Sequence, residues 1–348
     1  MNKRFFGIII ILSLLITIFI PTTCVGAVNT YSIRVGKKLQ LTSTFKKPAW
    51  GSSDTSVATV SDKGVVKGKS KGKCYISAVY NGMAEVYVIK VKAAKVKEVK
   101  EKENEVPSNE VSFGGKEYTL TFSDDFDSFD TGKWGYCPQQ IRQDVGGVWR
   151  DSCSKFENGN YVITCDVAAN GTPISGGIRT RSKFEQTYGL YHMRFKMEKS
   201  SGLWYAFWLM TDKMSGAGNG NGAVDSAEID ILEVVPRTGE FCTTIHWDGY
   251  GWYHKKRGET TFVDDNFFGK YHEIWFLWDK DGYRLYLDGT DESCLMFDMP
   301  GKEYGDGTCA VPCYLKITAE YGTWGGDIDK SKLPALFYVD YVRVYKEK

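Results

Sequence analysis

Residues 111–348 contain many short runs in which apolar and polar residues alternate, and they show no long helical periodicity. This pattern restricts their fold more than any other feature of the sequence. Strand-like runs recur between turn residues, from residues 118–122 near the start of this region to residues 336–345 near its end. Successive side chains of a strand point to opposite faces, so these runs suit sheets that bury one face. Many strands over roughly 235 residues, without interleaved helices, predict one β-sandwich or closed barrel.

The first 27 residues have the pattern of an export signal. Lys3 and Arg4 precede an apolar run at residues 5–20, and Val25-Gly26-Ala27 provides small residues for cleavage after Ala27. The run is shorter than the roughly 20 residues that a membrane span needs, so an uncleaved anchor is the less favoured alternative. We expect a secreted or cell-surface protein with no membrane insertion after cleavage.

Two further segments precede the main domain. Residues 28–93 carry short alternating runs separated by Gly and Ser-Asp turns, which predict a small all-β module. Residues 94–110 are dominated by Lys and Glu and contain no aromatic residue, so we interpret them as a solvated linker, with a short helix as the alternative. The expected order is a signal at 1–27, a β module at 28–93, a linker at 94–110 and the main domain at 111–348.

Charge and cysteine content restrict the possible partners. The 44 Lys and Arg residues balance the 43 Asp and Glu residues, so we expect no nucleic-acid partner. Eight cysteines follow the signal, and their spacing neither reveals a disulfide pairing nor includes a C-x2-C pair for zinc. We expect buried thiols or structural bridges, and a monomer. These cysteines are Cys74, Cys137, Cys153, Cys165, Cys242, Cys294, Cys309 and Cys313.

Carboxylic acids alternate with apolar residues inside the strand-like run at residues 227–235. On a strand, Glu228 and Asp230 share a face because side chains repeat every two residues. Glu233 breaks that parity, and it can join the other two only if the strand carries one extra residue, a β-bulge around residues 231–232. With this bulge, three carboxyls converge on one face.

Three converging carboxyls point to glycoside hydrolysis. Two carboxyls about 5–5.5 Å apart suit a retaining glycosidase, in which one is the nucleophile and the other is the acid that becomes the base. We expect Glu228 to be the nucleophile and Glu233 to be the acid/base, with a pKa raised by the neighbouring charge and by partial burial. Asp230 would hydrogen-bond to the nucleophile and tune it. An acidic edge strand and a metal site are the alternatives.

The surrounding motifs resemble glycoside hydrolase family 16, in particular laminarinase-like members with the signature Glu-x-Asp-x-x-Glu. The resemblance extends over the whole main domain and implies an all-β, concanavalin A-like jelly-roll sandwich that cleaves a polysaccharide internally. It rests on residues 122–127, 134, 177–184, 188–191, 202–209, 246–247 and 337–345. Residues 50–60, 64–66 and 72–76 resemble the bacterial Ig-like domain (group 2), a small β-sandwich that adds no chemistry.

Aromatic side chains supply flat platforms for sugar rings. Trp204 and Trp208 are four residues apart in a strand and share a face, so they form either the cleft floor or the core. Trp247 and Trp252 lie in a Gly-rich stretch that predicts a loop, where we favour substrate contact over burial.

The resemblance adds further substrate contacts and leaves the substrate open. Arg194 matches a family position that contacts substrate near the cleavage point, and His246 matches a family His near the catalytic acids. His192 stands where family β-glucanases commonly have Glu, and the stretch from Glu320 to Trp324 departs from the family's Asn-containing run. We expect all five residues to contact substrate, and the departures keep a β-galactan open as an alternative.

The resemblance also implies a structural calcium ion on the convex side of the sandwich. The matching positions are Asp125, Gly159 and Asp340. An acid and backbone carbonyls suit Ca²⁺, although Asp340 could instead form a cap or a salt bridge at the sheet end. Catalysis would not depend on this ion, and no cofactor is required.

The sequence therefore predicts a secreted retaining endo-β-glycanase whose partner is a polysaccharide, most simply a β-1,3 or mixed β-1,3/1,4-glucan. An endo-hydrolase of a β-galactan-type polysaccharide on the same scaffold is the second hypothesis. A non-catalytic glycan-binding surface protein is the third, which the Ig-like module favours and the intact acids oppose.

Overall fold

The computed structural model describes residues 23–24, 29–92, 107–139, 144–301 and 308–348. The chain divides into two compact units, residues 1–94 and 95–348, and each is described by itself. Almost all of the expected export signal, and most of the expected linker, lie outside the described residues.

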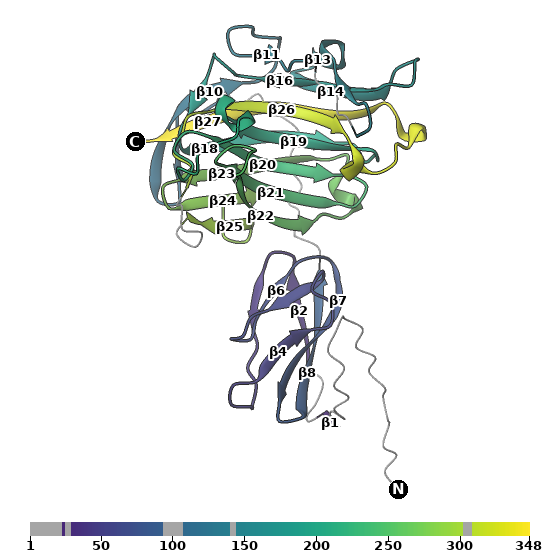
Figure 1. Ribbon diagram of the computed structural model, residues 1–348, viewed down its shortest axis with the longest axis vertical. Helices are drawn as coiled ribbons and strands as arrows, with labels where there is room; N and C mark the ends of the chain where they lie inside the picture. Colours follow the sequence, from purple (N-terminus) through teal and green to yellow (C-terminus); the bar gives the residue numbers. More distant parts are fainter. Residues whose placement is uncertain (1–22, 25–28, 93–106, 140–143, 302–307) are drawn as a thin grey trace. The chain divides into compact units, whose positions relative to one another are not determined.

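The first unit is a small β-sandwich, drawn in purple and dark blue in Figure 1. Its core contains Val66, Ile76 and Ile89, which are fully buried between a five-stranded and a three-stranded sheet. The first sheet consists of β1 (Thr23–Cys24), β2 (Asn29–Arg34), β4 (Ala49–Ser52), β7 (Gly72–Tyr80) and β8 (Met83–Lys92), and the second of β3 (Lys38–Gln40), β5 (Ala58–Val60) and β6 (Val65–Gly68). The prediction of a small all-β module is confirmed.

The second unit consists of two large sheets that pack face to face. In Figure 1 the strands of one sheet run over those of the other, in the order β26, β19, β20, β21 and β22 from top to bottom. The eight-stranded sheet consists of β11 (Gly135–Tyr136), β16 (Gly177–Arg179), β17 (Glu185–Gln186), β19 (Leu203–Met210), β20 (Ala227–Val235), β21 (Glu240–Trp247), β22 (Lys255–Phe262) and β26 (Cys313–Tyr321).

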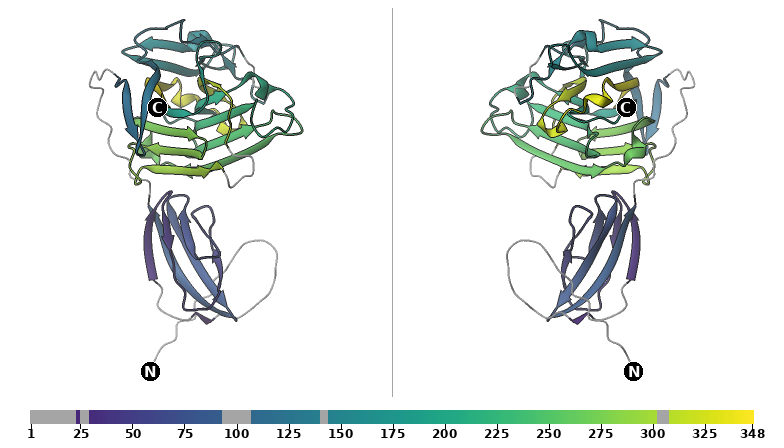
Figure 2. Two further views of the ribbon diagram at one scale, coloured as in Figure 1. Left: turned by 90° about the vertical axis from the view of Figure 1, so that its left-hand side faces the viewer. Right: turned by 90° about the vertical axis from the view of Figure 1, so that its right-hand side faces the viewer.

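The eleven-stranded sheet forms the opposite layer. The side views in Figure 2 place teal strands at the upper edge of this unit and light green strands at its lower edge. This sheet consists of β9 (Glu110–Phe113), β10 (Lys116–Asp124), β12 (Val148–Trp149), β13 (Ser154–Glu157), β14 (Asn160–Val167), β15 (Pro173–Ser175), β18 (Gly189–Met197), β23 (Tyr271–Asp279), β24 (Gly282–Leu287), β25 (Leu295–Pro300) and β27 (Ala335–Glu347).

Strand parity determines which residues enter the core between the sheets. On β18, Met193 and Phe195 are fully buried in the core, and on β19 Tyr205 and Phe207 meet them from the other sheet. Each such side chain stabilises the fold by roughly 1.5–3 kcal/mol relative to an exposed position, so a one-residue register slip is strongly disfavoured. The predicted all-β sandwich is confirmed.

Helical structure is limited to single 3₁₀ turns among the described residues. They are η1 (Asp151–Cys153), η2 (Asp212–Ser215), η3 (Asp265–Phe267), η5 (Thr323–Gly325) and η6 (Lys330–Lys332). In the described part of the chain, no helix combines the length and the apolar composition needed to cross a membrane. The eight cysteines from Cys74 to Cys313 are buried thiols, and no disulfide joins them.

Candidate active site

Strand β20 carries the bulge that its acid spacing predicts. Neighbouring residues of β19 pair with Leu232 and Asp230, which leaves Ile231 without a partner across this ladder. The register with β21 shifts at the same place, between Asp230 and Glu233. Both bulge residues point into the core, and Glu233 returns to the face of Glu228 and Asp230. The parity prediction is confirmed.

A buried hydroxyl on the neighbouring strand stabilises the bulge. Thr243 of β21 is fully buried, and its Oγ1 donates a hydrogen bond to Ile231 O at 2.8 Å. A bulge interrupts the regular ladder, so its backbone groups need other partners. Thr243 therefore satisfies a buried carbonyl at the point where β20 changes parity.

The three acids lie in a cleft of about 560 Å³ on the outer face of the eight-stranded sheet. The cleft residues are Asp144, Trp149, Trp204, Ala206, Trp208, Met210, Ser215, Glu228, Asp230, Glu233, His246, Tyr250, Lys316, Glu320, Thr323 and Trp324. The structure thus brings together eight of the expected site residues, which are Trp204, Trp208, Glu228, Asp230, Glu233, His246, Glu320 and Trp324.

Burial and mutual repulsion disfavour the ionised forms of the cleft acids. Burial, and then the charges of Glu233 and Glu228, raise the pKa of Asp230 well above its ordinary value. Burial also raises the pKa of Glu228, although a hydrogen bond from Tyr250 and the charge of Lys316 oppose this shift. The stronger upward shift at Asp230 favours its protonated form over that of Glu228, so Glu228 is the acid of this pair that ionises more readily.

Tyr250, in the loop that follows β21, and His246 of β21 contact the acids, and His254 contacts His246. The Tyr250 hydroxyl donates a hydrogen bond to Glu228 Oε1. His246 Nε2 lies 3.5 Å from Asp230 Oδ2, and His246 Nδ1 lies 2.9 Å from His254 Nε2. Burial, followed by the charge of His254, lowers the pKa of His246 to about 4, so the ring is neutral at pH 7. A neutral ring can link Asp230 to His254 because one nitrogen donates and the other accepts.

The same cluster has the spacing of a cation site. Ligand atoms of Glu228, Asp230 and His246 lie within 4.8 Å of one another. Carboxyls that share a proton lie at similarly short distances, so this spacing alone does not indicate a metal ion. Tyr250 already engages Glu228, and His254 already engages His246. These contacts account for the cluster as a set of acids and hydrogen-bond donors, without a metal ion.

Lys316 of β26 is the one amine that lines the cleft among the described residues. Its Nζ lies 3.5 Å from the ring centroid of Trp208 and 5.0 Å from that of Trp149. Burial lowers the pKa of Lys316, while the charges of Cys137, Glu320 and Glu228 oppose this shift. The Lys316 side chain covers one face of Trp208, and sugar contact at Trp208 stays a prediction.

The other expected aromatic contacts have different positions. Trp204 and Trp324 line the cleft with ring centroids 5.5 Å apart, and the Trp324 indole donates to Glu240 Oε2 at 3.1 Å. Trp247 ends β21 and packs in the core, so its expected loop position is wrong. Trp252 lies in the loop after β21 with 94% of its surface exposed, outside the cleft lining. Substrate contact at Trp252 stays a prediction.

Comparison with known proteins matches both units. The family model for glycosyl hydrolases family 16 matches residues 141–342, more than half of the chain. The chain belongs to glycosyl hydrolases family 16. The model for the bacterial Ig-like domain (group 2) matches residues 16–91. Both resemblances seen in the sequence are therefore confirmed, together with the jelly-roll fold.

Relatives within family 16 differ in substrate. A keratan-sulfate endo-1,4-beta-galactosidase from Sphingobacterium multivorum is 29% identical over 66% of this chain and 56% of its own length. A glucan endo-1,3-beta-glucosidase A1 from Niallia circulans is 31% identical over 50% of this chain and 26% of its own length. A non-specific endo-beta-1,3(4)-glucanase crystallised with a glucan oligosaccharide is 27% identical, with a TM-score of 0.55 over 66% of this chain and 95% of that chain. The chain spans about half, or less, of the first two relatives.

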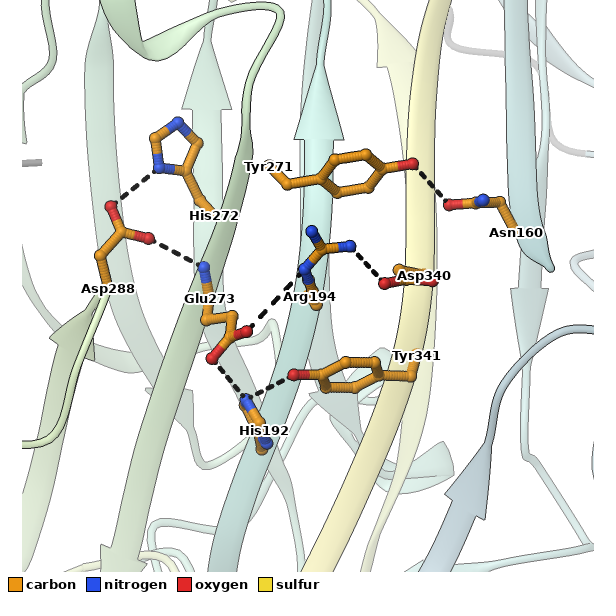
Figure 3. A network of polar contacts seen from close by, with 9 residues as sticks. All are labelled: Asn160, His192, Arg194, Tyr271, His272, Glu273, Asp288, Asp340 and Tyr341. Atoms are coloured by element: carbon orange, nitrogen blue, oxygen red, sulfur yellow. Dashed lines mark hydrogen bonds and ion pairs between the residues drawn. The ribbon is translucent and has the colours of Figure 1, made fainter. Parts of the chain in front are cut away.

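Two residues that we expected at the family 16 cleft lie on the opposite sheet. Parity on β18 turns His192 and Arg194 out of the eleven-stranded sheet, away from the core and from the cleft on the other sheet. Figure 3 shows the polar contacts that these two residues make. His192 Nε2 lies 3.3 Å from Glu273 Oε2 and 3.2 Å from the Tyr341 hydroxyl, and Arg194 pairs with Asp340. We call these five residues the outer network. The expected position of His192 and Arg194 in the cleft is wrong.

The expected calcium site does not fit the arrangement of its residues. Arg194 donates to the carboxylate of Asp340, and Arg343 donates to the carboxylate of Asp125. Each acid that would bind Ca²⁺ therefore already engages a guanidinium, which supplies the compensating charge. Gly159 lies in the turn between β13 and β14, with a positive φ of 65°.

Four functional positions were not anticipated from the sequence. Tyr250, Lys316 and Trp149 line the cleft, and Thr243 holds the bulge. Only Lys316 could have been recognised from the sequence. A charged residue inside the apolar run of β26 needs a polar surface or an oppositely charged partner, which indicates a special position. Tyrosine, tryptophan and threonine are ordinary strand and loop residues, so their types indicated nothing specific.

Proposed function

We propose that this family 16 protein is a secreted retaining endo-β-glycanase in which Glu228 is the nucleophile and Glu233 is the acid/base. The bulge of β20 supports this proposal most directly, because it turns Glu233 to the cleft face that Glu228 and Asp230 already occupy. Without the extra residue, the two glutamates would point to opposite faces of the sheet and could not act on one glycosidic bond.

The proposed reaction has two steps. In the first, ionised Glu228 attacks the anomeric carbon while Glu233 protonates the departing oxygen, which leaves a covalent glycosyl-enzyme. In the second, Glu233 removes a proton from water, the water oxygen bonds to the anomeric carbon, and Glu228 is released as a carboxylate. The raised pKa of Asp230 favours its protonated form, which limits the negative charge beside the nucleophile.

The charge of the cleft favours a neutral polysaccharide. Its described lining contains five carboxyl groups and one amine, the Lys316 side chain, and His246 is neutral at pH 7. Like charges brought together across an interface are costly, so a sulfated or uronate-rich chain would be repelled. We therefore propose a neutral β-linked substrate, with β-1,3 or mixed β-1,3/1,4-glucan first.

A β-galactan-type polysaccharide is the second candidate. Glu320 lies in the cleft at the departure from the family's Asn-containing run, and a carboxylate there can accept hydrogen bonds from sugar hydroxyls of different orientation. Similarity to a keratan-sulfate endo-1,4-beta-galactosidase points the same way. The acidic lining would then favour an unsulfated galactan.

A panel of polysaccharides separates these candidates. Reducing-end release is measured from laminarin, lichenan, β-galactan and agarose, and from keratan sulfate before and after desulfation. Release from laminarin or lichenan supports the first candidate, and release from β-galactan alone supports the second. Faster release from sulfated than from desulfated keratan would contradict the charge argument. No release from any of them favours a non-catalytic glycan-binding protein.

The roles of the two glutamates are tested by rescue with azide. Glu228→Ala removes the proposed nucleophile, so azide should attack the anomeric carbon from the side opposite the leaving group. The product should be the α-glycosyl azide. Glu233→Ala leaves the nucleophile in place, so azide should attack the covalent intermediate and produce the β-glycosyl azide. Proton NMR of the wild-type reaction should show the β-anomer first, as retention requires. First release of the α-anomer would exclude a retaining mechanism.

A further inference from the structure

Two glycine-rich loops interlock at the rim of the cleft and fix the position of Tyr250. Tyr250 N donates to Gly216 O at 2.8 Å. The backbones approach so closely that a Cβ added to Gly218 would lie 1.5 Å from Asp248 O. Only glycine allows this approach, so the glycines of residues 212–226 allow the loop at residues 248–254 to pack closely against them. We call residues 212–226 and 248–254 the rim loops.

The Tyr250 side chain reaches from the rim to the acid that we propose as nucleophile. Its hydroxyl donates to Glu228 Oε1, although 48% of the residue surface is exposed. The ring therefore covers part of the cleft rim while the hydroxyl points inward. Tyr253, three residues later, packs instead against Gly220 of the other rim loop and does not line the cleft.

The Tyr250 hydroxyl remains a proton donor throughout the working pH range. Burial, followed by the charge and hydrogen bond of Glu228, raises the pKa of Tyr250 far above its ordinary value. An O–H bond to a carboxylate is a strong, charge-assisted hydrogen bond, and it favours the ionised form of the acid. The other ionisable groups around Glu228 are Asp230 and Glu233 of β20, His246 of β21, and Lys316 and Glu320 of β26.

We propose that Tyr250 is a positioning residue whose hydroxyl holds Glu228 Oε1, so that Oε2 is the atom that attacks the anomeric carbon. This inference rests on the proposed role of Glu228 as nucleophile. The rim loops position the donor, and the carboxylate motif supplies the acceptor.

Tyr250 transfers no proton in either step. When the bond between Oε2 and the anomeric carbon forms, the carboxylate loses its charge and the hydrogen bond at Oε1 weakens. When water attacks, the electron pair of that bond returns to Glu228, and the Tyr250 hydroxyl stabilises the carboxylate as it departs. Loss of the hydroxyl should therefore slow the second step in particular.

A platform for sugar is the competing role for a half-exposed tyrosine at a cleft rim. The two roles differ in what the hydroxyl contributes. A phenylalanine retains the ring, so it would preserve a platform and would abolish the hydrogen bond. The variant Tyr250→Phe therefore separates the roles, and Tyr253→Phe is the matched control because it removes a hydroxyl from the same loop outside the cleft.

The test measures kcat, KM and the pH profile of the full-length protein and both variants on the polysaccharide that it cleaves. For Tyr250→Phe we expect kcat to fall by about 10-fold to 100-fold, the loss of one hydrogen bond to a charged group, with little change in KM. The acidic limb of the kcat/KM profile should move to higher pH, because Glu228 loses a donor that favours its ionised form. Tyr253→Phe should remain within twofold of the parent.

A mechanism-based label distinguishes failure of this inference from failure of the proposed function. A 2-deoxy-2-fluoro-β-laminaribiosyl fluoride, with the corresponding galactobiosyl fluoride as a second probe, loses its anomeric fluoride to the attacking carboxylate and traps the covalent intermediate for peptide mass spectrometry. Label on Glu228 with slower reactivation of Tyr250→Phe supports the inference. Label on Glu228 with unchanged kinetics, or with only a raised KM, overturns the inference alone. Label on another residue overturns the nucleophile assignment and the inference with it.

Discussion

The two faces of the sandwich carry two clusters of buried carboxyl groups with opposite electrostatic balance. In the cleft, burial and neighbouring negative charges raise the pKa of Asp230. In the outer network, burial would raise the pKa of Glu273, but hydrogen bonds from His192 and Tyr341 and the charge of Arg194 outweigh it and lower the pKa. Figure 3 shows Glu273 beside His192 and Arg194. Proximity and burial are common to both clusters, so neither identifies the catalytic one.

The ratio of acids to cationic or donor groups distinguishes the two clusters. The cleft holds carboxyls in excess, and the raised pKa values there favour the retention of protons, which acid/base chemistry needs. The outer network satisfies its acids with a guanidinium, an imidazole and a phenol, which makes it a stabilising unit of the eleven-stranded sheet. The predictions below test this contrast, from the largest effect to the smallest.

Matched amide substitutions on the two faces should have unlike effects on activity. Glu228→Gln removes the proposed nucleophile, and we expect kcat to fall by ~10³-fold or more, comparable to the loss of an essential group in other covalent mechanisms. Glu273→Gln lies on the opposite sheet and should leave kcat within twofold. Initial rates on the cleaved polysaccharide decide this, and a large loss in Glu273→Gln would mean that the outer network takes part in catalysis.

Removal of the cation from the outer network should destabilise the fold. Arg194 is 3% exposed and Asp340 is fully buried, so Arg194→Met leaves a buried charge without its guanidinium. We expect a loss of ~3–5 kcal/mol in the free energy of unfolding, measured by urea denaturation, with kcat little changed. The double variant Arg194→Met/Asp340→Leu removes both charges and should recover much of that loss. If the single variant unfolds like the parent, the pair is not a stabilising element.

Neutralising one acid in each cluster should change thermal stability in opposite directions. The raised pKa of Asp230 means that its stability contribution is complete below ~pH 3.9 and is lost as pH rises through the folded value. Asp230→Asn cannot ionise, so at pH 7 to 8 its Tm should exceed that of the parent, and the difference should shrink toward pH 4. Its kcat should fall by roughly 10-fold to 100-fold, because the acid beside the proposed nucleophile is replaced by an amide that cannot take up or release a proton.

The lowered pKa of Glu273 has the opposite sign. Its contribution is present above ~pH 4.3 and is lost as pH falls through the folded value, so Glu273→Gln should lower Tm at neutral pH and converge with the parent in acid. Calorimetry of both variants across this pH range makes the comparison. Shifts of the same sign would contradict the assigned balance of the two clusters.

The smallest expected effect concerns the amine in the cleft. Lys316→Met removes the positive charge that favours ionised Glu228, so the acidic limb of kcat/KM should move up by roughly half to one pH unit. Lys316→Arg keeps the charge and should leave the limb near its original position. An equal shift in both variants would indicate a packing role over the Trp208 ring instead.

The sequence by itself determined the strand architecture and the bulge. Alternation of apolar and polar residues is a local property that fixes which face of each strand is buried, and it predicted the all-β sandwich. The same parity argument placed Glu228 and Asp230 on one face and required an extra residue before Glu233 could join them. Local periodicity sufficed because all three acids belong to one strand.

Tertiary structure alone decided which outward face is the cleft and which distant residues enter it. His192 and Arg194 alternate outward just as Glu228 does, but they belong to the other sheet, and parity within a strand does not say which layer that strand joins. Tyr250 and Lys316 meet the acids across separate loops and strands. Such contacts depend on the order of strands in the sheets and on how the loops pack. The residue types at single positions of the sequence do not predict either.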